Sequence, residues 1–116
     1  MAKPAAHRIS SAHAPENTLS IEYALPDETI RTLKIRKFQY IPRPVADASD
    51  EWIAKEIEEG RTPGELHLME YLIEALAPEE FVHIKAMSIG ERREIWDYWE
   101  KESKVDMGKS EASENS

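Results

Sequence analysis

Residues 18–41, TLSIEYALPDETIRTLKIRKFQYI, contain the strand signals that decide the fold. Apolar and polar side chains alternate over residues 19–23 and again over residues 33–35, which is the period of a strand with one buried face. Turn-forming residues occupy positions 26–28 between them. The apolar phase changes at Lys37, which indicates a β-bulge or the end of the strand. We therefore expect a β-hairpin that must pack on other elements, because an isolated hairpin is only marginally stable.

The chain after the hairpin has the apolar spacing of helices. Pro42 and Pro44 stop the strand ladder. Either Asp47 or Ser49 can cap a short helix, and Gly60 can end it.

Two capping boxes predict further helix starts. Residues 62–65, TPGE, place Pro63 at the first helical position, and Pro78 ends this helix and opens the next one. Residues 88–91, SIGE, begin a last helix that runs to about Ser103. The expected fold class is α+β and mostly helical, with an N-terminal β-hairpin packed on a bundle of about four short helices.

The length of 116 residues suits one small core. The two ends hold few large apolar side chains, so they cannot bury enough surface to offset their conformational entropy. We predict a disordered N-terminal arm over residues 1–17 and a disordered C-terminal tail over residues 104–116. The single domain between them spans residues 18–103, with the hairpin at 18–41 and the helices at 47–103.

Composition excludes several classes of protein. The chain has no cysteine, which excludes disulfide scaffolds, thiol nucleophiles and cysteine-based zinc sites. With 23 acidic and 15 basic residues the net charge is -8, which argues against a nucleic-acid binder. No apolar run approaches the ~20 residues that span a bilayer, and no signal peptide is visible. We expect a cytoplasmic protein with no nucleic-acid or membrane partner.

Charge is distributed unevenly along the chain. Residues 1–46 carry seven basic and four acidic side chains, whereas residues 47–116 carry eight basic and 19 acidic ones. Five basic residues follow one another with no acid between them: Arg31, Lys34, Arg36, Lys37 and Arg43. They form either a solvated strand face or a patch that meets an acidic surface, such as another copy of the chain.

Catalytic motifs are absent from the sequence. It has no phosphate-binding glycine loop and no HExxH. His67, Glu70 and Glu74 share one helical face, so a metal site is geometrically possible, although a solvated polar face is the simpler interpretation. We expect no enzyme activity, no metal and no cofactor.

The last helix carries a stripe that contains Arg92, Ile95, Trp96 and Trp99. Two indoles in so small a domain are hard to bury together, so we expect one in the core and one, Trp99, at a partner surface. The candidate partner-binding residues are Trp99, Trp96, Tyr98, Arg92 and Trp52.

Residues 77–113, APEEFVHIKAMSIGERREIWDYWEKESKVDMGKSEAS, resemble the C-terminal part of tail assembly chaperones from long-tailed, siphovirus-type phages of actinobacteria. The shared pattern is a short helix at 81–87, a capped helix at 88–103 that contains both tryptophans, and a polar tail with a Gly108-Lys109-Ser110 element. The family more often has an acidic residue at the position of Lys109. The hairpin and first helices are similar to the family in arrangement only.

The resemblance implies a binding protein that keeps the long, helical tape measure protein soluble and helps tail-tube protein assemble around it. Such chaperones are made in the host cell cytoplasm and are usually absent from the mature virion. A minor, longer form arises in this family by programmed ribosomal frameshifting near the end of the gene.

The codons permitted by Met107, Gly108 and Lys109 are compatible with frameshifting. Methionine is encoded by ATG only, so ATG GGA AAG can encode the three residues and contains the slippery heptamer G GGA AAG in phase. A polar tail is also a place where a second segment can be attached without disturbing a core.

Three alternatives remain open at the level of the sequence. The first is a structural neck or tail protein that stays in the virion. The second is a small acidic inhibitor or DNA mimic that acts on host machinery. The third is a metal-dependent hydrolase built on His67 and Glu70.

Overall fold

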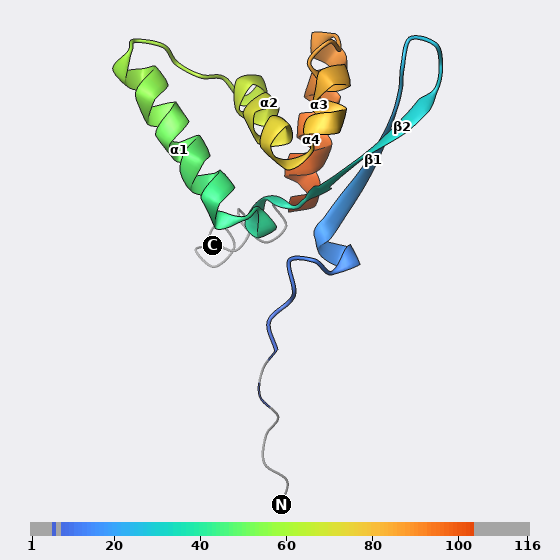
Figure 1. Cartoon of the computed structure of the whole chain (residues 1–116), viewed down its shortest axis with the longest axis horizontal. Coiled ribbons are helices and arrows are strands. Elements are labelled where there is room, and N and C mark those ends of the chain that lie inside the picture. Colours follow the sequence, from blue (N-terminus) through green and yellow to red (C-terminus); the bar gives the residue numbers. More distant parts are fainter. Residues whose placement is uncertain (1–5, 7, 104–116) are drawn as a thin grey trace, which may run out of the picture.

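The computed structural model describes residue 6 and residues 8–103 (Figure 1). In this part of the chain, strands β1 (Thr18–Ala24) and β2 (Ile30–Arg36) form an antiparallel hairpin. The helices α1 (Arg43–Glu58), α2 (Glu65–Leu76), α3 (Pro78–Ile84) and α4 (Ile89–Ser103) follow it. Two 3-10 turns, η1 (Pro15–Asn17) and η2 (Phe38–Tyr40), flank the hairpin. The α+β class is confirmed, and none of the described helices is long and apolar enough to span a membrane.

The hairpin buries the apolar face that its alternation predicts. Leu19 lies opposite Ile35, and Ile21 lies opposite Leu33. Leu19, Leu33 and Ile35 are buried, whereas Ser20, Thr32 and Lys34 on the other face are exposed. β2 ends at Arg36 and η2 follows, so the phase change at Lys37 is a strand end and the hairpin stops short of residue 41.

One hydrophobic core joins the hairpin to α2, α3 and α4. Its buried members are Leu19, Leu33, Ile35, Met69, Leu72, Ile73, Ile84, Ile95, Trp96 and Trp99. Helix α1 contributes no fully buried apolar side chain, since its one buried residue is Ser49. It lies at one side of the molecule and is joined to α2 by the 59–64 connection (Figure 1). This helix is therefore held at the margin of the core.

The predicted start of the first helix is wrong. Helix α1 begins at Arg43 rather than at Asp47 or Ser49. Pro42 occupies the N-cap position and Pro44 lies in the first turn, where no backbone N–H has an intrahelical acceptor to lose. Ser49 is an interior residue whose hydroxyl donates to the carbonyl of Ala46. The two prolines therefore start this helix, and the expectation that they stop the strand ladder is wrong, because β2 already ends at Arg36.

One of the two predicted capping boxes is confirmed. The backbone N–H of Ser88 donates to Glu91 Oε1 at 2.9 Å, and the N–H of Glu91 donates to Ser88 Oγ at 3.2 Å. Helix α2, by contrast, begins at Glu65 after an extended Gly64, so Thr62 is not its cap. The Nδ1 atom of His67 accepts the Gly64 N–H at 3.4 Å.

The ordered domain begins before Thr18, which corrects the predicted limit of the N-terminal arm. Pro15–Asn17 forms η1, and Asn17 is buried. Its side-chain amide donates to the carbonyl of Ser11 at 2.7 Å, and its own carbonyl accepts the N–H of Lys37 at 3.0 Å. The rest of the predicted arm from residue 8 is described as largely exposed chain, whereas residues 1–5 and 7 and the tail over 104–116 lie outside the described residues.

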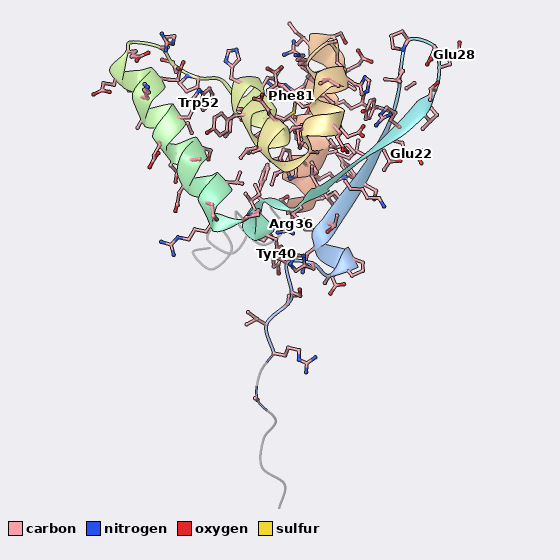
Figure 2. The ribbon with its side chains drawn as sticks, viewed as in Figure 1. Glu22, Glu28, Arg36, Tyr40, Trp52 and Phe81 are labelled. Atoms are coloured by element: carbon pink, nitrogen blue, oxygen red, sulfur yellow. The ribbon has the colours of Figure 1, made fainter. Side chains whose placement is uncertain are left out.

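Replacing Glu28 with glycine is expected to stabilise the protein by about 0.5–1 kcal/mol. Glu28 lies at the tip of the hairpin (Figure 2) and has a φ of 72°, a left-handed conformation that costs energy in any residue with a Cβ atom. The free energy of unfolding from urea titration measures the effect. Glu28→Ala is the matched control, because it removes the carboxylate but keeps the Cβ, and equal effects of both changes would contradict backbone strain.

Candidate partner-binding surfaces

The expectation that Trp99 is exposed to a partner is wrong. Trp99 and Trp96 are 0% and 5% exposed, respectively. The indole N–H of Trp99 donates to the carbonyl of Arg36 at 2.9 Å, which ties α4 to the end of β2. The Phe38 ring lies 4.9 Å from Trp99 and 5.2 Å from Trp96, measured between ring centroids. Phe38 thus covers both indoles, and neither tryptophan is a surface anchor.

The end of α4 is held by a contact that the sequence did not predict. Ser103 is completely buried, and its hydroxyl accepts the backbone N–H of Phe38 at 3.0 Å. Together with the Trp99 bond, it fixes η2 against the last turn of α4. A serine beside a polar tail has no sequence signal that distinguishes this role.

The other three predicted partner residues differ in their exposure and in their contacts within the protein. Arg92 is mostly buried and donates to Glu70 Oε2 at 2.6 Å, so it joins α4 to α2. The Trp52 ring stacks on Tyr71, with ring centroids 5.0 Å apart, and joins α1 to α2. Tyr98 is 41% exposed. Of these three, only Tyr98 has the exposure of a surface contact.

An apolar groove lies between α1, α2 and the η2–α4 junction. Its volume is about 220 Å³, and most of its lining is apolar. The lining residues are Phe38, Ile41, Ala46, Ser49, Asp50, Ile53, Leu68, Leu72 and Trp96. The indole N–H of Trp96 has no hydrogen-bond acceptor within the described residues. We call this the α1–α2 groove.

A second hollow, of about 300 Å³, lies between β1 and α4. It is lined by four consecutive strand residues, Ile21, Glu22, Tyr23 and Ala24, and by Met87, Glu91, Glu94, Ile95 and Tyr98. Its rim is therefore acidic. A hollow of about 410 Å³ on the β2 side has a basic rim and is lined by Thr18, Lys34, Ile35, Arg36, Pro42, Val45, Ala75 and Leu76.

A polar cluster attaches the hairpin to α3. Glu80 accepts hydrogen bonds from Arg31, whose Nη2 atom lies 2.6 Å from Oε2, and from the hydroxyl of Tyr23. The Arg31 guanidinium holds the pKa of the Glu80 carboxyl below its usual value. Burial, followed by the hydrogen bond to Glu80, raises the pKa of Tyr23 to about 12. These three groups hold the hairpin against α3, and the charges of Arg31 and Glu80 pair with each other.

The predicted basic patch is divided among different partners. Arg31 is paired with Glu80. Arg43 Nε lies 3.6 Å from Asp47 Oδ2, and Arg36 Nη2 lies 3.2 Å from His13 Nδ1. Lys34 is exposed on the outer face of β2, and Lys37 is half-buried. The cluster is thus not one continuous surface of free cations, and Lys34 and Arg36 are its members at the β2 hollow.

Two of the candidate metal ligands make contacts within the protein that have nothing to do with a metal. Glu70 is paired with Arg92, and His67 lies at the start of α2 beside Gly64. Within the described residues, no group of three or more His, Asp or Glu side chains could hold a metal ion.

The remaining candidate residues, Met107, Gly108 and Lys109, lie outside the described part of the chain. Comparison of the chain with protein-family models, curated proteins and solved structures finds no match.

Proposed function

We propose that this protein is a phage tail assembly chaperone that binds the tape measure protein, keeps it soluble and promotes assembly of the tail tube. The resemblance of residues 77–113 supports the family, and the α1–α2 groove is the observation that supports binding to a helix. The proposed partner is a long helical protein whose apolar faces would aggregate before the tube covers them.

The α1–α2 groove has the chemistry that an amphipathic helix requires. Its floor is formed by apolar side chains of α2 and α4 and its side by Ile53 of α1. Ile57, one turn further along α1, is 60% exposed, so the apolar row of α1 continues beyond the groove. An apolar helical face placed between two helices would bury this row.

Helix α1 is also suited to adapt to an occupant. It has no fully buried apolar side chain, and its contacts with α2 include the Trp52–Tyr71 stack and a hydrogen bond from the Tyr71 hydroxyl to the carbonyl of Ala48. Elements with few buried contacts move at a lower energetic cost than core elements. The net charge of -8 would then give a chaperone–client complex the repulsion that opposes aggregation.

Replacing Ile53 with aspartate should weaken binding to the tape measure protein of the same phage by about tenfold or more, because a charge would enter an apolar contact. Binding is measured by isothermal titration with a soluble tape-measure fragment, and folding by circular dichroism. Val82→Asp is the matched control, since Val82 is 51% exposed on α3 and does not line the groove. Equal binding by both variants would exclude the groove as the site.

Two further observations separate this function from its alternatives. Mass spectrometry of purified particles should not find the chaperone, whereas a structural neck or tail protein would be present. The nucleotide sequence at Met107–Lys109 decides whether the slippery heptamer exists, and therefore whether the longer frameshifted form can be made.

A further inference from the structure

Both edges of the hairpin have backbone groups that the ladder does not use. The N–H of Leu25 donates to Thr29 at one end of the ladder, and the N–H of Lys37 donates to Asn17 at the other. In an antiparallel pair, hydrogen-bonded and non-hydrogen-bonded residue pairs alternate. With the observed register, Ser20, Glu22 and Ala24 therefore direct their backbone N–H and C=O groups away from β2.

The same phase applies to the other strand. Thr32, Lys34 and Arg36 direct their backbone groups away from β1. Within residues 8–103 the sheet contains only β1 and β2, so neither edge is covered by a third strand. The Arg36 carbonyl accepts the Trp99 indole N–H, which leaves Thr32 and Lys34 as the freer part of the β2 edge.

The two edges carry opposite charge. The β1 edge borders the hollow rimmed by Glu22, Glu91 and Glu94. The ion pairs found among the described residues include none of these three carboxylates. The β2 edge borders the hollow that contains Lys34 and Arg36. Electrostatic attraction therefore favours contact between the acidic β1 edge of one copy and the basic β2 edge of another.

We propose that the β1 edge of one copy pairs with the β2 edge of a second copy, so that hairpins of successive copies form a continuous antiparallel sheet. A copy that is rotated about an axis parallel to the strands keeps its strand directions, and its β2 therefore runs antiparallel to the β1 that it meets. Edge strands are the usual site of such strand addition.

One register satisfies both the hydrogen bonds and the charges. Glu22 lies opposite Lys34 of the second copy, because both direct their backbone groups to an open edge and both side chains lie on the outer face. Ala24 then lies opposite Thr32 of the second copy. The inward residue Ile21 lies opposite Ile35, so apolar side chains stay on the helix-covered face.

Like edges would repel one another. Pairing β1 with β1 brings Glu22 and Glu94 of two copies together, and pairing β2 with β2 brings Lys34 and Arg36 together. The contact is therefore head-to-tail, which leads to open arrays or rings rather than to a closed two-fold dimer. This inference does not depend on the tape measure protein.

Sedimentation velocity of the purified chain over a concentration series tests the inference. The expected result is a mass that rises past the dimer with concentration and falls with added salt, because the contact is between unlike charges. A monomer at every concentration up to the millimolar range, or a dimer that grows no further, would overturn the proposal.

Charge exchange tests the register. Glu22→Lys and Lys34→Glu should each weaken association about tenfold or more, since each places like charges opposite one another. An equimolar mixture should recover it, because the new lysine on β1 of one variant meets the new glutamate on β2 of the other, and the second junction is wild type. Glu51→Lys and Lys101→Glu are controls with the same charge changes at exposed helix positions. A mixture that remains as weak as the separate variants would overturn the proposed register.

Discussion

Trp99→Ala should lower the free energy of unfolding by about 3–5 kcal/mol, the range for a fully buried tryptophan. Trp99 is completely buried, packs on Phe38 and donates its indole N–H to the carbonyl of Arg36. The substitution would leave a cavity in the core and a carbonyl without its donor. Chemical denaturation followed by far-UV circular dichroism gives the change in the free energy of unfolding.

Tyr98→Ala is the matched control for this effect, because Tyr98 precedes Trp99 in α4 but is 41% exposed. It should cost about 1 kcal/mol or less. Trp99→Phe separates the two contributions, since it keeps much of the packing and removes only the hydrogen-bond donor. A Trp99→Ala variant as stable as the wild type would contradict the core role.

Glu80→Ala should lower the free energy of unfolding by about 1–2 kcal/mol, the second largest effect expected from one substitution. The Glu80 carboxylate accepts hydrogen bonds from Arg31 and Tyr23, and these bonds attach the hairpin to α3. Arg31 is partly exposed, so water replaces some of the lost interaction. Thermal and urea denaturation measure the change.

Glu79→Ala is the control for Glu80, because it removes the neighbouring carboxylate in the same helical turn, where the side chain is exposed. Its effect should be within about 0.5 kcal/mol. If both variants were equally destabilised, loss of negative charge at the start of α3 would explain the result better than loss of the hydrogen bonds to Arg31 and Tyr23.

The stability of the protein should also depend on pH through Glu80 and Tyr23, because their pKa values are shifted in the folded state. Because Arg31 lowers the pKa of Glu80 in the folded state, the stabilisation is present above the ordinary carboxyl pKa and is lost as the pH falls through the folded pKa. The pKa of Tyr23 is raised to about 12, so its contribution is present below its ordinary value of 10.0 and is lost as the pH rises toward 12. The Glu80→Ala variant should lack the acid component in urea titrations at several pH values.

The two proposed contacts can exist on one molecule at the same time. Among the described residues, none lines both the α1–α2 groove and either of the hollows at the hairpin edges. Copies joined through their hairpins would therefore each keep a groove for a helix. An array of this kind would suit the proposed partner, a long tape measure protein, since linked weak contacts bind more tightly than single ones.

Local sequence patterns determined the elements whose causes are local. The alternation around Ile21 and Leu33 predicted the buried face of the hairpin, because side chains on a strand alternate between its faces. The Ser88–Glu91 capping box predicted the start of α4, because both of its hydrogen bonds join residues three apart. The buried face of α2 has a local cause as well, because Met69, Leu72 and Ile73 recur at helical spacing.

Tertiary packing alone determined which of the candidate binding residues are buried and which remain available to a partner. Trp96 and Trp99 are buried because η2 places Phe38 over them, a contact between residues about 60 positions apart that no helical spacing encodes. Arg92 is engaged by Glu70, which the fold brings close from another helix. Each helix face has the same amphipathic pattern whether it meets the core or a partner, so only the neighbouring elements determine which apolar side chains remain available at the α1–α2 groove.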